Sequence, residues 1–273
     1  MKKVFILTLL LLGIITFATA QRFISKLDWK NDLQQQNLKG RVKSTQIYSY
    51  EAIKNGKDIV KGKKSNNMVN DPFVSYNMFG NMVLECNGGN IDVCSGETTY
   101  EYNALNKKIR ISYYGGKQIM EFHYNDTGHI AGRTVYKGEN DTIKSYFVIN
   151  IKGNVLEEIF YKNDGTGGKQ TFKYDKNDYL SELNRFLDDK HTKITYLNDK
   201  NGLVLEKTLY HNGVKEDRIT YKYDKNGNVI EETSNQAKYK YQYKYDENGN
   251  WTERIWLTNG NPYEFDERII EYY

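Results

Sequence analysis

The chain repeats a short segment rich in tyrosine, asparagine and glycine at nearly regular intervals. Residues 221–228 read Tyr-Lys-Tyr-Asp-Lys-Asn-Gly-Asn, and residues 243–250 read Tyr-Lys-Tyr-Asp-Glu-Asn-Gly-Asn. Weaker copies run back to residue 74. Self-similarity at a fixed period is typical of repeat architectures, in which each unit buries its apolar face only against its neighbours. The repeat therefore restricts the fold class more than any other feature of the sequence.

A turn position marks each of eight copies. A glycine occupies it at Gly80, Gly128, Gly153, Gly202, Gly227 and Gly249, and Asn106 and Asp178 take its place in the other two copies. Successive positions are 22 to 26 residues apart. A second turn lies about halfway through most repeats, for example at Asn212-Gly213 and Asn259-Gly260. Asn-Gly is typical of the type I′ turn, which requires positive φ angles at both central residues.

The segments between these turns alternate aromatic and polar residues, as in Tyr221-Lys222-Tyr223. Such alternation predicts a β-strand with one packed face. Two strands in each of eight repeats give about 16 strands in an antiparallel meander, about 75 Å wide if flat. Open sheets of more than about ten strands tend to curl. We therefore predict an all-β fold, a long antiparallel meander of repeated β-hairpins in one curved or curled sheet.

The last 23 residues, 251–273, concentrate apolar side chains after the final full repeat, including Trp251, Trp256 and Phe265. Terminal units of repeat proteins are atypical because they cover an otherwise open end. This pattern predicts a C-terminal cap on the sheet.

The N-terminus has the pattern of a secretory signal peptide. Two lysines follow Met1, residues 4–17 are mostly apolar, and Ala18-Thr19-Ala20 fits a cleavage site. The apolar run is too short for a good membrane span. We predict a signal peptide at 1–20 and a soluble exported protein, periplasmic or extracellular, with no membrane span.

The remaining chain divides into two parts, an N-terminal lead-in at 21–71 and a repeat domain at 72–273. Residues 23–36 could form a short amphipathic helix, and residues 45–52 resemble a strand. Residues 54–70 are polar and rich in lysine and asparagine. They predict a mobile loop, either simply solvated or a phosphate or glycan site.

Cys86 and Cys94 are the two cysteines, and Asn-Gly-Gly-Asn lies between them. An exported protein meets an oxidising compartment. A disulfide across a hairpin tip is the favoured interpretation over two free thiols. A metal pair is less favoured, because no further ligands are near in the sequence.

Motifs that carry chemistry are absent from the sequence. Its four histidines form no metal-binding pair, and neither a nucleophile elbow nor a phosphate-binding loop is present. The Asp-x-Asn-Gly-Asn segments at 224–228 and 246–250 resemble calcium loops, but position twelve is not glutamate and helices do not flank them. We predict turns there, no metal, no cofactor and no catalytic residues. Without Lys2 and Lys3 of the signal peptide the net charge falls from +4 to about +2, which gives no case for nucleic acid.

Tyr-Asp-x-x-Gly-Asn, which residues 223–228 and 245–250 match in full, is the signature of YD repeats. Over residues 74–273 the chain therefore resembles the RHS-like repeat proteins, and its ending resembles small exported members of the Bacteroidetes type. The resemblance implies a β-hairpin repeat fold and an exported location. The toxin function of large RHS proteins does not carry over, because no toxin domain or self-cleaving region is visible.

Two functions remain compatible with the sequence. The favoured one is a non-enzymatic binding or scaffold protein of the cell envelope or exterior, with an unknown glycan or protein as its ligand. Its possible binding face is a tyrosine ladder, Tyr221, Tyr223, Tyr241, Tyr243 and Tyr245. The alternative is a hydrolase of envelope glycans that uses paired carboxylates brought together by the curvature of the sheet. Asp141-Thr142-Ile143 also fits a weak O-glycosylation pattern, for which an unmodified turn is the simpler interpretation.

Overall fold

The computed structural model describes residues 31–65, 72–87, 94, 96–138 and 141–273. The predicted signal peptide and most of the predicted helix at 23–36 lie outside these residues. Within them, one short helix, α1 (Asp32–Gln35), precedes a long series of strands. No helix in the described ranges has the length and apolar character needed to cross a membrane.

All strands belong to a single sheet, and sequence neighbours are antiparallel partners throughout the repeats. The strands are β1 (Val42–Asn55), β2 (Asp58–Lys64), β3 (Phe73–Tyr76), β4 (Met82–Asn87), β5 (Gly96–Tyr102), β6 (Lys108–Tyr113), β7 (Gln118–Tyr124), β8 (Ile130–Tyr136), β9 (Thr142–Ile149), β10 (Val155–Lys162), β11 (Gly167–Tyr174), β12 (Leu180–Leu187), β13 (Lys190–Asn198), β14 (Val204–His211), β15 (Val214–Tyr223), β16 (Val229–Thr233), β17 (Lys238–Tyr245), β18 (Trp251–Thr258) and β19 (Asn261–Tyr272).

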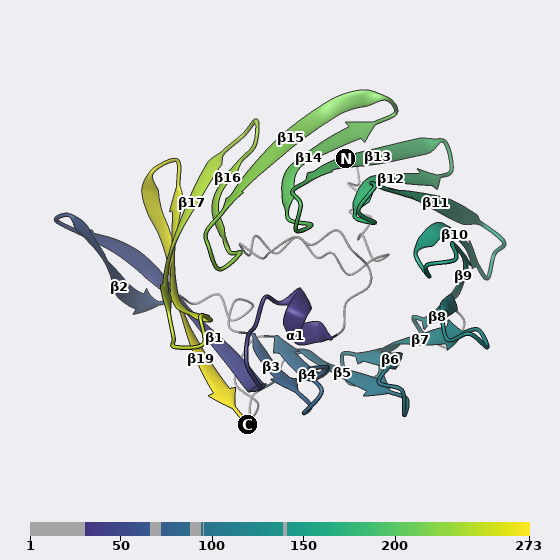
Figure 1. Ribbon diagram of the computed structural model, residues 1–273, viewed down its shortest axis with the longest axis horizontal. Coiled ribbons are helices and arrows are strands. Elements are labelled where there is room, and N and C mark those ends of the chain that lie inside the picture. Colours follow the sequence, from purple (N-terminus) through teal and green to yellow (C-terminus); the bar gives the residue numbers. More distant parts are fainter. Residues whose placement is uncertain (1–30, 66–71, 88–93, 95, 139–140) are drawn as a thin grey trace, which may run out of the picture.

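The sheet closes on itself, which corrects the prediction of an open, curved meander with a terminal cap. The N-terminal part of β1 pairs with β19 on one side, from Val42 opposite Tyr272 to Glu51 opposite Glu264. On its other side the same part of β1 pairs with β3. All strands except β2 thus form an 18-stranded barrel, drawn as a ring in Figure 1.

The C-terminal residues are therefore a closing strand and not a cap. A bare β19 would expose unpaired backbone groups, and β1 satisfies them. The sequence reveals the repeats but not this closure, because β1 lies outside the repeats and has no Tyr-Asp turn to link it to β19.

Eight turns at one end of the barrel share one hydrogen-bonding pattern. Each begins with Asn or Asp, whose backbone N–H donates to the carbonyl oxygen of the fifth residue. The side-chain oxygen of that first residue accepts the fifth residue's N–H. The fourth residue has positive φ in every case, and it is glycine in six of them. We call these the Asx turns; they span 77–81, 103–107, 125–129, 150–154, 175–179, 199–203, 224–228 and 246–250.

These turns correct part of the type I′ prediction. At Asn226-Gly227 only the glycine has positive φ, 82°, whereas at Asn212-Gly213 the values are 47° and 81°. The type I′ geometry thus holds at the halfway turn, while the Asx turn is a three-residue loop with a bulge in the adjoining strand. The Asp224 side chain accounts for the difference, because it accepts the N–H groups of Asn226 and Asn228 at 2.8 and 2.9 Å.

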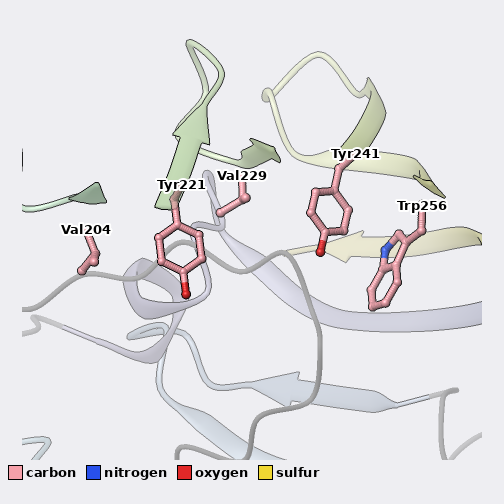
Figure 2. Close-up of a cluster of buried hydrophobic side chains, with 5 residues drawn as sticks. All are labelled: Val204, Tyr221, Val229, Tyr241 and Trp256. Atoms are coloured by element: carbon pink, nitrogen blue, oxygen red, sulfur yellow. The ribbon is translucent and has the colours of Figure 1, made fainter. Parts of the chain in front are cut away.

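The two faces of the sheet differ in composition. Figure 2 shows Tyr221, Tyr241 and Trp256 pointing from their strands toward the inside of the ring, where they pack with Val204 and Val229. We call this face the inner wall, and its opposite the outer wall. Alternate residues of the same strands, such as Lys222 and Lys244, lie on the outer wall.

Residues 31–41 lie inside the ring against the first strands, where Figure 1 draws α1 beside β3 and β4. The Leu33 N–H donates to the carbonyl oxygen of Gly80 over 3.0 Å, in the first Asx turn. Farther along, the Lys39 N–H donates to Oδ1 of Asn250 over 2.8 Å, in the last Asx turn. This N-terminal segment therefore joins the first repeats to the last across the seam where the barrel closes.

Two features of the N-terminal half test further predictions. Residues 54–64 are not a loop: β2 pairs with the C-terminal part of β1 in a hairpin that projects from the ring in Figure 1. Lysine and polar residues are common in such exposed hairpins, so composition alone suggests a loop.

The predicted disulfide between Cys86 and Cys94 is confirmed, with the two Cα atoms 5.5 Å apart. Residues 88–93, between them, lie outside the described residues.

Candidate binding surface on the inner wall

The five tyrosines of the predicted binding face all lie on the inner wall. Tyr221 and Tyr241 are 6% and 4% exposed, and both pack in the cluster of Figure 2. Tyr223 and Tyr243 are half-buried against the same cluster. Burial raises the pKa of Tyr221 and Tyr241 well above the usual value for a phenol, so both rings are neutral.

Most of these tyrosines also have a structural role. The Tyr223 hydroxyl donates to the carbonyl oxygen of Val204 over 2.7 Å, and the Tyr243 hydroxyl to that of Val229 over 2.8 Å. The Tyr245 hydroxyl donates to the Asp224 carboxylate. Because these hydroxyls hold the sheet together, a ligand would meet mainly the ring faces of this ladder.

A buried ion pair joins β18 and β19 on the inner wall. Nη2 of Arg254 lies 2.9 Å from Oδ2 of Asp266, and the Ser49 hydroxyl donates to the other carboxylate oxygen over 2.6 Å. Arg254 is 4% and Asp266 1% exposed. The Arg254 guanidinium also lies 4.8 Å and 4.9 Å from the ring centres of Trp251 and Trp256.

A second arginine lies beside this pair. The guanidinium carbon of Arg268 is 3.9 Å from the centre of the Trp251 ring, and its Nε donates to the Trp251 carbonyl oxygen over 2.8 Å. Burial lowers the pKa of Arg268 to about 9. We call Arg254, Asp266 and Arg268 the C-terminal arginine cluster.

A comparable group occupies β8 to β12. Nη2 of Arg133 lies 2.7 Å from Oε1 of Glu158, and these side chains are 7% and 2% exposed. Glu158 is directly opposite Gln170, and Gln170 is directly opposite Arg185. Burial lowers the pKa of Arg185; the Glu158 carboxylate opposes that shift and Arg133 adds to it. We call Arg133, Glu158, Gln170 and Arg185 the central arginine cluster.

A third group places an acid and a base on the wall near the tyrosines. Burial is the main cause that raises the pKa of Glu232. The nearby Lys207 lowers this pKa, whereas Asp217 raises it further. Burial likewise lowers the pKa of Lys207. Glu232 is directly opposite Tyr221, which places it on the inner wall.

The resemblance to calcium loops is not supported, because hydrogen-bond donors already occupy the carboxylate oxygens of Asp224. One Asp224 oxygen accepts two backbone N–H groups, and the other accepts the Tyr245 hydroxyl, so the carboxylate is occupied by donors. Among the described residues, no group of three or more His, Cys, Asp or Glu side chains is placed to hold a metal ion.

The outer wall carries ladders of ion pairs. Glu182 accepts Lys173 at 2.7 Å and Lys193 at 3.1 Å. Glu231 in the same way lies between Lys222 and Lys238, and similar pairs join other neighbouring strands. Charged groups therefore cover much of this wall.

The arginine clusters were not predicted from the sequence. A signal for them does exist, because Arg133 shares the alternating register of Val135, and Arg254 that of Trp256. A charged residue in the apolar register of a strand indicates a buried charge. Recognising it requires knowing which register faces inward, and the repeat alone does not show this.

Comparison with known proteins gives no family. No protein-family model matches the chain, and no curated protein matches it. Among solved structures, a porin-like protein from Bacteroides uniformis ATCC 8492 has 13% identity and a TM-score of 0.43, covering 84% of this chain and 96% of that chain. A chain of the TcdB2-TccC3-Cdc42 complex has 11% identity and a TM-score of 0.39, covering 85% of this chain. The alignment spans only 16% of the length of that second protein.

Proposed function

We propose that this chain is an exported, non-enzymatic binding protein of the cell envelope or exterior, with its ligand site on the inner wall. The observation that carries the proposal is the pair of arginine clusters. Each combines two arginines with a single ion-paired carboxylate, and each lies beside aromatic rings. Buried charge is costly unless it is compensated, so such clusters are more typical of sites than of cores.

The charged side chains of the outer wall support a location in an aqueous compartment. A barrel that faces lipid presents a continuous apolar band about 25 Å tall. Here the wall carries ladders such as Lys173–Glu182–Lys193 and Lys222–Glu231–Lys238. These ladders favour an aqueous compartment, which agrees with the predicted signal peptide at 1–20.

The Asx turns support the assignment to small exported YD-repeat proteins. In this chain the Asp of Tyr-Asp caps the turn, and the Tyr bonds back to the preceding repeat, as Asp224 and Tyr223 do. The signature thus has a structural basis in the residues that carry the resemblance.

A pull-down tests the binding function. The tagged mature protein is incubated with the envelope fraction of the producing cell, and a heat-denatured sample of the same protein serves as the control. We expect glycan or protein to be retained by the folded protein alone. Retention no greater than that of the denatured control would reject the binding function.

One observation favours the hydrolase as a second candidate. Glu232, whose pKa is raised by burial, lies near Asp217 and Lys207 on the inner wall. A carboxyl whose pKa is raised by burial, placed near a second carboxyl, is the arrangement that general acid catalysis of glycoside cleavage uses. Release of reducing sugar from envelope glycan by the parent, abolished in Glu232→Gln, would establish this activity; equal release by both proteins would reject it.

A further inference from the structure

Several hydrogen-bonding groups in the central arginine cluster have no hydrogen-bond partner. Gln170 is 1% exposed, and neither its amide nitrogen nor its amide oxygen has a partner in the structure. Nε of Arg133 and Oγ of Ser145 are also buried and unpartnered. Buried polar groups in native proteins are nearly always hydrogen-bonded, so several orphans in one place indicate a missing partner.

These groups share one patch of the inner wall. Phe147, Glu158, Gln170 and Arg185 are directly opposite one another on the four successive strands β9 to β12. Arg133 reaches this row through its ion pair with Glu158. The patch is about 14 Å across, since neighbouring strands are about 4.8 Å apart.

The charge of the patch selects an anion. Arg133 is paired with Glu158, whereas Arg185 makes no ion pair with any residue that the structure describes. Arg185 is half-buried, so it stays in reach of a ligand. The cluster therefore carries one surplus positive charge. One carboxylate would neutralise it, while a phosphate dianion would leave excess negative charge beside Glu158.

The donors fit a carboxylate as well. An arginine guanidinium binds a carboxylate through two parallel N–H bonds, and the Gln170 amide can donate to the same group and accept from a neighbouring hydroxyl. Phe147 adds an aromatic face at one end of the row, with the Arg133 guanidinium 5.9 Å from its ring centre. A sugar ring, which carries hydroxyl groups on one side and C–H groups on the other, matches these polar and aromatic side chains.

We propose that the central arginine cluster binds the carboxylate of an acidic sugar, with Arg185 and Gln170 as the contacting residues. The proposal names the ligand class of the binding function proposed above and rests on it. A peptide ligand is disfavoured, because extended peptides commonly add to a free strand edge. Every strand of the described ring is paired on both sides.

Titration of the mature protein with glucuronate, galacturonate and short oligomers of each tests the proposal. Isothermal calorimetry should show binding of the uronates, and neither glucose nor inorganic phosphate should compete. Arg185→Gln should weaken binding at least tenfold, and Arg185→Lys by less. Arg218→Gln is the matched control, because Arg218 pairs with Glu206 on the outer wall, and it should bind like the parent.

Gln170→Leu provides a second variant if Arg185→Gln fails to fold. Leucine removes two orphaned polar atoms, so this variant should melt no lower than the parent and still lose uronate binding. Uronate affinity equal to the parent in the folded variant would overturn the site, as would a parent that binds no uronate or that phosphate displaces equally well. If the parent retains envelope material but both variants retain it equally, this site is wrong and the binding function stands.

Discussion

Tyr223 donates its hydroxyl hydrogen to the carbonyl oxygen of Val204, the first strand residue after the preceding Asx turn, over 2.7 Å. The same bond recurs from Tyr102 to Met82, from Tyr124 to Lys108 and from Tyr174 to Val155, at 2.7 to 2.8 Å. A bulge follows each Asx turn directly after the residue that carries this carbonyl, as Leu205 does after Val204. The tyrosine of one repeat thus completes the turn of the repeat before it.

Replacing Tyr223 with phenylalanine should lower the free energy of unfolding by about 1–2 kcal/mol, because the Val204 carbonyl oxygen loses its donor. Urea denaturation followed by circular dichroism measures this change. Tyr146→Phe is the control, since Tyr146 is 58% exposed on the outer wall, and it should stay within about 0.5 kcal/mol of the parent. Equal losses in the two variants would show that the Tyr223 hydroxyl has no special role.

The turn glycine at position 227 has a φ of 82°, a value that a side chain disfavours. Gly227→Ala should cost roughly 1–2 kcal/mol. Gly227→Asn should cost less, because asparagine tolerates this conformation and Asn106 adopts it at the equivalent turn position with φ 57°. Melting temperatures of the two variants decide the point. An alanine variant as stable as the asparagine variant would contradict the backbone argument.

The sequence predicted the repeats well because their signals are local. The alternation in Tyr221–Tyr223 and the turn at Gly227 depend on residues within a few positions of each other, and the structure places strands and turns there. Closure depends instead on the contact of Val42 with Tyr272, which are 230 residues apart. No local pattern encodes that pairing, so the barrel was missed and the last strand was interpreted as a cap.

The inner-wall site was missed for a related reason. Arg185 and Gln170 become neighbours only through the register of β11 and β12. The tyrosine ladder was visible because its members are close in sequence, but the hydroxyls of Tyr223 and Tyr243 prove to be partners of the backbone. Sequence alone therefore found the repeated framework, while the residues that differ between repeats need the structure to bring them together.

Deleting residues 251–273 should expose the edges of β17 and β1, each of which loses a partner strand. We expect aggregation, because unpaired strand edges recruit other chains. Deleting residues 54–60 from the projecting β1–β2 hairpin is the matched control and should leave a monomer that melts near the parent. Size-exclusion chromatography compares the two. A monomeric, equally stable C-terminal deletion would contradict the closed barrel.

Acid should weaken the outer-wall ladder at Glu182. Its hydrogen bond with Lys173, followed by that with Asn184 and the pairing with Lys193, lowers the pKa of this carboxyl to about 2, against 4.5 for an ordinary glutamate. A lowered pKa stabilises the fold above the ordinary value, and that stabilisation is lost as the pH falls from 4.5 toward 2.

Glu182→Gln should therefore be less stable than the parent at pH 7, with the difference shrinking as the pH falls to 2. Denaturation at several pH values measures it. The effect at pH 7 should be modest, because the lysine ends are solvated and water screens such pairs. A difference between the two proteins that is constant from pH 7 to 2 would show that the carboxylate does not gain from its lysines.

Removing one partner of the buried pair of Arg254 and Asp266 should destabilise the protein much more than breaking an ion pair on the outer wall. Asp266→Asn leaves an uncompensated guanidinium in a site where Arg254 is 4% exposed, and removing one partner of a buried pair costs about 3–5 kcal/mol. Glu253→Gln breaks the exposed pair with Lys244 on the neighbouring outer position and should cost less than about 1 kcal/mol.

The double variant Arg254→Met, Asp266→Leu should recover most of the lost stability, because it removes both charges together. Chemical denaturation of the three variants gives the comparison. A double variant no more stable than Asp266→Asn would show that the Ser49 and tryptophan contacts, and not the balance of charge, hold this part of the inner wall together.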